Sequence, residues 1–284
     1  MLPPGPQLIL GFGLAAVIGL LAWRLGALDR SGAVGAFLIG GAVFGFGGPV
    51  WGAVLVAFFL GSSALSYFRS DRKSNLITDS ARAPRRNLSQ TLANGGLAAM
   101  LALAVGIVTR ESPWYPTLTL AYFGALSAAA ADTWATELGL LSSRPPHLIT
   151  TRAVVSAGRS GGVTTVGLLA SLAGGAFIGL SAFILIQLAS LATTGQWFLQ
   201  DWFLLPLCTL AGFSGSLVDS FLGATWQRQN FCNTCQITTE QAEHSCGNPT
   251  QHVHGVSWLN NEVVNFMTTV TGGVVAAMLS LIFI

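Results

Sequence analysis

Charged residues are scarce in this sequence. Only 8% of its 284 residues are Asp, Glu, Lys or Arg, whereas 52% are hydrophobic. An ordinary soluble domain carries about 25% charged residues, so most of this surface is not suited to water. Runs of roughly 20 largely apolar residues, the length that crosses a ~30 Å hydrocarbon layer, recur along the chain and leave no room for a soluble domain. The composition therefore predicts a single transmembrane domain over residues 1–284.

Two further absences argue against particular classes of function. The net charge is only +2 and no long run of Lys and Arg is present, so no surface is expected to hold a nucleic-acid backbone. No Ser-His-Asp or Cys-His arrangement of a catalytic nucleophile is visible, and His147 stands alone in a predicted loop. Nucleic-acid binding and covalent catalysis are therefore not expected.

We expect an all-α bundle of about eight membrane spans. They cover residues 7–23, 33–49, 50–68, 91–109, 117–141, 163–192, 202–224 and 261–284, and the second and third form a tight hairpin around Gly47, Gly48 and Pro49. Of the thirteen Lys and Arg residues, all except Arg110 fall in the loops that follow the odd-numbered spans. By the positive-inside rule these loops are cytoplasmic and both termini lie outside.

Three acidic residues fall within the spans, namely Asp132, Glu137 and Asp219. A carboxylate inside a bilayer is costly, and by default indicates function when it faces partners or water. At 1.5 Å per residue, Asp132 lies ~22 Å along the fifth span and Asp219 ~24 Å along the seventh, both toward the cytoplasmic face. Each is followed by a hydroxyl residue and an aromatic one, which hints at an internal duplication. The alternative, that an acid pairs with a nearby cation or caps a helix, stays open, above all for Glu137.

Other polar groups are expected at the same level of the membrane. They include Asn94, Asn265 and the segment from Gly161 to Thr164, at the starts of neighbouring spans. Carboxylate, amide and hydroxyl oxygens suit Mg²⁺, which commonly binds through one or two carboxylates and substrate phosphates. Glu137 is about 140° around the helix from Asp132, so it either flanks a ligand or meets a neighbouring helix.

Two segments have features of phosphate sites. The glycine-rich stretch 158–164 leads directly into an apolar helix, whose first N–H groups and dipole favour an anion. The basic cytoplasmic loop 69–90 places Arg85 and Arg86 shortly before Asn94. Alternatively, such cations set topology or contact anionic lipid heads. We expect that second role for Arg72 and Lys73, and both roles stay open for Arg85 and Arg86.

The cytoplasmic loop 226–258 contains a Cys/His set, formed by Cys232, Cys235, His244 and Cys246. Three thiols and one imidazole are ligand types that zinc prefers, and the predicted reducing side of the membrane disfavours disulfides. The spacing is not that of a common zinc finger. A structural zinc site is therefore expected, with a metal-free loop as the alternative.

Several segments in order along the chain resemble a known family. The resemblance is carried by Arg30–Ala33, Gln90–Gly96, Ala131–Gly139, Gly161–Thr164, Gly215–Thr225, the loop from Cys232 to Cys246, and Asn260–Asn265. They are similar to an integral membrane family, long of unknown function, that includes the plant and cyanobacterial phytyl-phosphate kinases of the vitamin E pathway. Together they cover nearly the whole chain.

The resemblance implies phosphoryl transfer from a nucleoside triphosphate to an isoprenoid monophosphate, with phytyl phosphate as the expected substrate, for tocopherol or phylloquinone synthesis. On that basis Asp132 and Asp219 hold Mg²⁺, with Asn265 and Glu137 assisting. The phosphates are then bound by residues of the basic loop, the start of the fourth span and the glycine-rich stretch, namely Arg85, Arg86, Asn94, Gly161, Gly162 and Thr164.

Two other classes of function stay open. Glycine-interrupted helices and intramembrane acids are also typical of a secondary transporter of a small solute or lipid. A non-catalytic membrane scaffold is the third class, although buried acids with no ligand are a costly design. The acids lie toward one face rather than at the midplane, which favours an enzyme that uses cytoplasmic nucleotide.

Overall fold

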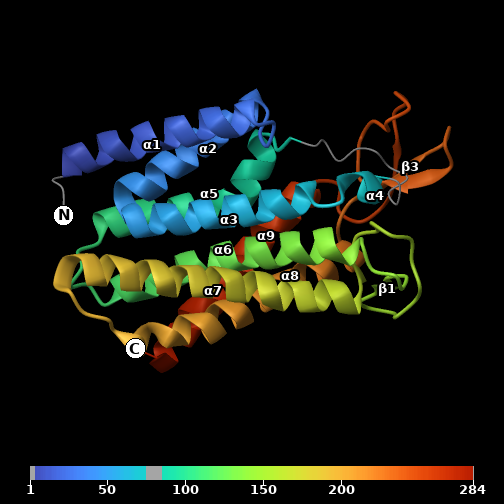
Figure 1. Ribbon diagram of the computed structural model, residues 1–284. Helices are drawn as coiled ribbons and strands as arrows, with labels where there is room; N and C mark the ends of the chain where they lie inside the picture. Colours follow the sequence, from blue (N-terminus) through green and yellow to red (C-terminus); the bar gives the residue numbers. More distant parts are fainter. Residues whose placement is uncertain (1–3, 75–84, 284) are drawn as a thin grey trace.

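Eight long helices lie side by side in the computed structural model, which describes residues 4–74 and 85–283 (Figure 1). They are α1 (Pro4–Arg24), α2 (Arg30–Ala42), α3 (Pro49–Tyr67), α5 (Leu88–Ile107), α6 (Trp114–Gly139), α7 (Thr165–Thr194), α8 (Leu204–Thr225) and α9 (Asn261–Phe283). Each corresponds to one expected span, so the all-α bundle is confirmed. Arg82 and the middle of the basic loop 69–90 lie outside the described residues.

Helix α6 is the centre of the bundle. It packs against α3, α5, α7, α8 and α9, and every residue from Leu120 to Ala131 is buried. Within the described residues seven helices are long and apolar enough to cross a membrane, and α6 is the long helix outside this set. Because α6 is enclosed by other helices, its surface meets protein rather than lipid and tolerates more polar residues.

The hairpin turn between α2 and α3 lies at the expected residues, but its two helices diverge, since α2 packs against α1 and α5 and α3 packs against α6 and α7. Helix α2 continues into a π-helix, η1 (Val43–Gly47), and Gly48 then adopts a φ of +88°, which is unfavourable for residues with a side chain. Pro49 follows at the first position of α3, where its missing N–H is not needed. The hairpin is fixed to the core, because the Tyr122 hydroxyl donates to the Trp51 carbonyl at 2.7 Å.

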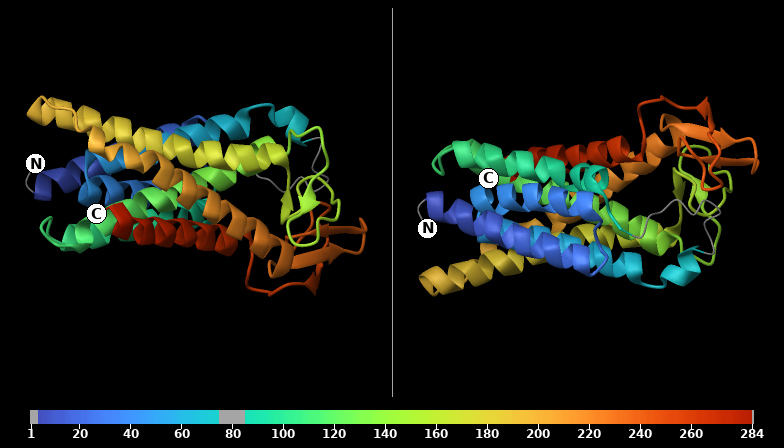
Figure 2. Two further views of the ribbon diagram at one scale, coloured as in Figure 1. Left: turned by 90° about the horizontal axis from the view of Figure 1, so that it is seen from below. Right: turned by 90° about the horizontal axis from the view of Figure 1, so that it is seen from above.

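The end of the bundle opposite both termini carries the short helices and strands of the loops (Figure 2). Its elements are α4 (Ser70–Ser74), β1 (His147–Leu148) paired with β2 (Gly162–Val163), and an antiparallel sheet of β4 (Ile237–Thr239), β3 (Gln229–Cys232) and β5 (Gln251–His254). The 3-10 helix η2 (Leu199–Phe203) precedes α8. We call this the strand end; its cytoplasmic orientation remains a prediction.

Small residues let three helices meet at one point. A Cβ added to Gly215 of α8 would lie 2.6 Å from the Cβ of Ala128 in α6 and 2.9 Å from the carbonyl oxygen of Thr268 in α9. Glycine and alanine permit such close backbone approach in membrane bundles. The contact at Gly215 therefore fixes the spacing of α6, α8 and α9.

Replacing Gly215 with Ala tests this contact. We expect Gly215→Ala to lower the free energy of unfolding by about 1–3 kcal/mol through overpacking, measured as a lower melting temperature in detergent. Gly13→Ala in α1 is the matched control, because nothing lies within 4 Å of its added Cβ. Equal melting temperatures for the two variants would contradict the close three-helix contact.

Candidate functional site

Asp132 of α6 and Asp219 of α8 form an acid pair inside the bundle. Their carboxyl groups lie within hydrogen-bonding reach of each other, and Asp219 also accepts a hydrogen bond from the Thr268 hydroxyl of α9 at 3.0 Å. Both acids are half-buried. The structure therefore brings together the two deeper acids that the sequence singled out.

The close helix packing explains why these two acids meet. Ala128 precedes Asp132 by four residues and Gly215 precedes Asp219 by four, which is about one helical turn in each case. Since Gly215 touches both Ala128 and Thr268, the turns that follow must also face one another. Asp132 and Asp219 are thus placed by the small residues one turn below them.

Electrostatics requires that the charge of the acid pair be balanced. Two carboxylates in contact repel strongly at low dielectric, so a shared proton or a cation must accompany them. Asn265 is three residues before Thr268, on the same face of α9 that reaches Asp219. Three helices thus direct hard oxygen atoms to one place, the donor type that Mg²⁺ prefers.

A further acid, Glu240, approaches the acid pair from the loop that follows α8. Its charge acts on Asp219, and its side chain accepts a hydrogen bond from the Ser160 hydroxyl. The Arg228 side chain holds the backbone, since Nη2 donates to the Glu240 carbonyl at 3.1 Å. Sequence reasoning missed Glu240 because its position depends on the path of the loop.

Glu137 lies in a different environment. It forms a buried ion pair with Lys73 of α4, with Nζ to Oε2 at 2.8 Å, and accepts from the Ser66 hydroxyl of α3 at 2.9 Å. The expectation that Lys73 meets lipid heads is therefore wrong, because its ammonium is paired inside the protein. Its role in setting topology stays a prediction. Assistance at the metal site by Glu137 stays a prediction.

Two of the residues expected to bind phosphate line an apolar cavity between α1, α2, α3 and α5. Arg86 and Asn94 contribute to its wall together with Gln90, in the segment that begins α5. Most of the other lining residues are apolar, among them Leu28, Ile39, Leu55, Phe58 and Phe59. Arg85 is exposed beside Gly26 at the same end. The cavity thus combines an apolar wall with polar groups near the strand end.

The Gly161–Gly162 turn packs tightly against the end of α8. Gly161 has a φ of +78°, and a Cβ there would lie 2.5 Å from Ala224. The Gly162 N–H donates to the Arg159 carbonyl, while the Thr164 hydroxyl accepts from the Gly167 N–H as the N-cap of α7. These N–H groups are engaged within the protein, so the structure gives this turn a packing role. Phosphate binding here stays a prediction.

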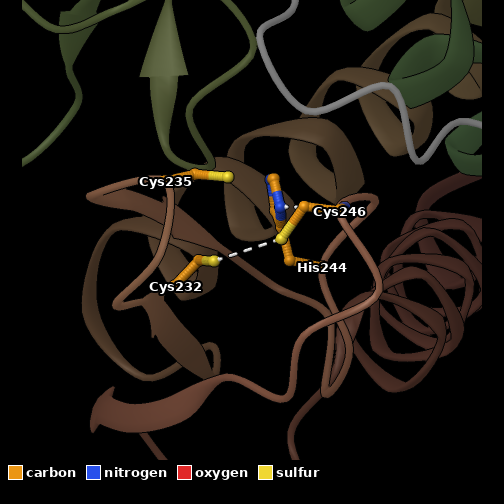
Figure 3. A group of neighbouring side chains, drawn as sticks. All are labelled: Cys232, Cys235, His244 and Cys246. Atoms are coloured by element: carbon orange, nitrogen blue, oxygen red, sulfur yellow. Dashed lines mark hydrogen bonds between the residues drawn. The ribbon is translucent and has the colours of Figure 1, made fainter.

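Cys232, Cys235, His244 and Cys246 cluster at the strand end (Figure 3). One ligand atom from each lies within 4.8 Å of all the others, and the Cys232 and Cys246 sulfurs are 3.7 Å apart. All four cysteines of the chain are free thiols. Hydrogen bonds with the side chains of Asn248 and His244 lower the pKa of Cys246 to about 6. The structure thus joins all four residues of the predicted zinc set.

The fold and the acid pair define a polytopic helical membrane protein with a polar site inside its bundle. Residues 13–273 match the family model described as integral membrane protein DUF92, and the chain belongs to that family. It is 33% identical to Protein PGR of Arabidopsis thaliana over 274 residues, which covers 93% of each chain.

Other relatives are more distant. An uncharacterized membrane protein, MJ0933 of Methanocaldococcus jannaschii, is 26% identical, with 96% of this chain and 94% of the relative covered. Protein VTE6, chloroplastic, of Arabidopsis thaliana is 21% identical, with 89% and 65% covered. No solved structure was found to match the chain.

The ion pair between Lys73 and Glu137 can be tested by a double-mutant cycle. We expect Lys73→Met to destabilise the protein by about 3–5 kcal/mol, because a buried carboxylate loses its cation. The double variant Lys73→Met/Glu137→Gln should recover most of this loss in thermal unfolding. If Lys73→Met melts like the parent protein, the buried pair does not contribute as described.

Proposed function

We propose that this protein is a membrane phosphotransferase that transfers a phosphoryl group from a nucleoside triphosphate to an isoprenoid monophosphate, with phytyl phosphate as the first candidate. The contact between Asp132 and Asp219 is the observation that carries the proposal. Membership of the family and the distant similarity to Protein VTE6 also support this proposal.

The acid pair fits Mg²⁺. Asp132 and Asp219 supply two carboxylates, and Asn265 supplies an amide oxygen from the face of α9 that reaches Asp219. A cation would relieve the repulsion between the acids. Mg²⁺ bound here would neutralise phosphate charge and polarise the phosphoryl group. Thr268 holds the Asp219 carboxylate by its hydrogen bond and so limits its rotation.

The polar groups around the acid pair share one level of the bundle. Asn94 is ~9 Å from the start of α5, while Asp132 and Asp219 are ~10 Å and ~9 Å from the ends of α6 and α8, at 1.5 Å per residue. These three helix ends lie at the strand end, and α5 packs against α6. A phosphate near Arg86 and Asn94 would therefore lie at the depth of the acids.

The apolar cavity has a volume of about 80 Å³, so it suits the part of a lipid tail next to the phosphate rather than the whole tail. Its walls are formed by α1, α2, α3 and α5, and its polar residues belong to the start of α5. An isoprenoid chain would pack along the apolar walls while Arg86 binds its phosphate, because guanidinium groups recognise phosphate oxygens. An attacking phosphate oxygen needs little help from a base, so these residues act by orientation and charge stabilisation.

A secondary transporter is the second candidate, because transporters also place acids among glycine-rich helices. Transport needs two alternating arrangements of the helices around the site. Helix α6 instead has an unbroken buried stretch of twelve residues, Leu120–Ala131, at the centre of the bundle. This enclosed central helix favours a rigid catalytic frame.

Turnover by the purified protein tests the proposal. In detergent or liposomes with Mg²⁺, a nucleoside triphosphate and phytyl phosphate, we expect formation of phytyl diphosphate. Asp132→Asn and Asp219→Asn should each lower turnover by about 100-fold or more, since several kcal/mol of charge stabilisation are lost.

Glu111→Gln is the matched control, because Glu111 is an exposed acid between α5 and α6, away from the strand end. It should keep full activity. Full activity in both Asp variants would remove the assignment of the site, and solute flux without turnover would favour the transporter.

A further inference from the structure

The Cys/His cluster has the dimensions of a zinc site. Zinc binds thiolate sulfur at ≈ 2.3 Å in tetrahedral geometry, which puts two sulfur ligands about 3.8 Å apart. The Cys232 and Cys246 sulfurs are 3.7 Å apart, too far for the ~2.05 Å bond of a disulfide. The separation therefore suits two ligands of one metal ion.

The backbone presents these ligands from two tight turns. Cys232 ends β3 and pairs with Ile237 of β4, and Cys235 lies in the turn that joins the two strands. His244 and Cys246 belong to a second turn, in which the Gly247 N–H donates to the His244 carbonyl at 2.8 Å. Two turns that each supply two ligands form a closed four-ligand set, as in structural zinc sites.

The strands of this loop bury no large apolar side chain. They have three or four residues each, and their buried residues are Gln229, Asn230, Cys232 and Thr239. Every residue of β5 is exposed, and Cys235 and Cys246 are exposed as well. Short sheets without a core are marginal in water, and metal binding is a common way to stabilise them. A bound metal would thus supply much of the stability of this loop.

The same hairpin carries Glu240 to the acid pair. Thr239 of β4 is buried and pairs with Asn230 of β3, so Glu240 directly follows the paired strand. The Asn230 side chain also donates to the Gln241 carbonyl at 2.8 Å. Glu240 accepts a hydrogen bond from Ser160, which packs against Gly223, one helical turn after Asp219. Its position near Asp219 therefore depends on the register of β3 and β4, and the turn between these strands, at the opposite end of the hairpin, carries Cys232 and Cys235.

We infer that Cys232, Cys235, His244 and Cys246 bind one structural Zn²⁺, which fixes the β3–β4 hairpin and thereby holds Glu240 beside the Asp132–Asp219 pair. The zinc is not at the acid pair and takes no part in its chemistry. Glu240 is a positioning residue that shapes the charge around Asp219. The zinc site does not depend on the proposed kinase activity. Only the predicted effect of Glu240 on turnover rests on that activity.

Metal analysis of the full-length protein in detergent tests the zinc site. We expect about one zinc per chain in the parent protein, as one four-ligand site requires, and its loss in Cys232→Ser. Cys208→Ser is the matched control, because Cys208 is buried inside α8. Cys235→His should keep zinc, since it replaces one zinc ligand type with another. Equal zinc content in the parent and Cys232→Ser, iron in place of zinc, or a Cys232–Cys246 disulfide would overturn the site.

Hydrogen exchange tests the link to Glu240 without any substrate. In Cys232→Ser, residues 229–243 should exchange at least about tenfold faster, while α6 and α8 stay protected, because local opening needs only the loop to lose its constraint. Unchanged exchange in a variant that has lost zinc would overturn the positioning role. Glu240→Gln should retain zinc and, if the kinase activity is present, alter the dependence of turnover on Mg²⁺ concentration.

Discussion

The contact between the carboxyl groups of Asp132 and Asp219 is the constraint on which the rest of the structure depends. Two acids do not meet inside a membrane bundle unless helix packing forces them together and a proton or cation balances their charge. Gly215 and Ala128 provide this packing, because they allow α6 and α8 to approach closely one helical turn before the two acids. The close contact of small residues thus positions the polar site.

The bundle around the acid pair has two parts with different tasks. Helices α6, α7, α8 and α9 pack closely and place the acids, while α1, α2, α3 and α5 enclose the apolar cavity with Arg86 at its polar end. The loops of the strand end lie over the first part, where Glu240 bonds to Ser160 and Ser160 packs against Gly223, one turn after Asp219. Under the proposed function, the head of the lipid substrate would react at the acid pair while the start of its tail lies in the apolar cavity.

Much of this arrangement could be predicted from the sequence. Span length and the distribution of Lys and Arg predicted the eight helices, and the cost of a buried carboxylate predicted that Asp132 and Asp219 share a site. Depth along a helix is a local property, so residue counting was enough to place the two acids at one level.

The features that the sequence did not reveal depend on contacts between distant segments. Lys73 resembles other cations of its loop, and only the turn into α4 brings it to Glu137, 64 residues away. Glu240 has no local pattern, because β3 and β4 are too short to predict and their register decides where it points. Thr268 lay within reach of sequence reasoning, as it continues the polar face of α9 one turn after Asn265.

The most direct measurement of the central claim is the location of a divalent ion in the protein. Mn²⁺ can replace Mg²⁺ at oxygen sites and gives an anomalous X-ray signal. Crystals grown with Mn²⁺ should show an anomalous peak between the carboxylates of Asp132 and Asp219, and Asp219→Asn should remove it. An acid pair that binds no ion at saturating Mn²⁺, with its carboxyl groups bonded directly to each other, would contradict the metal site.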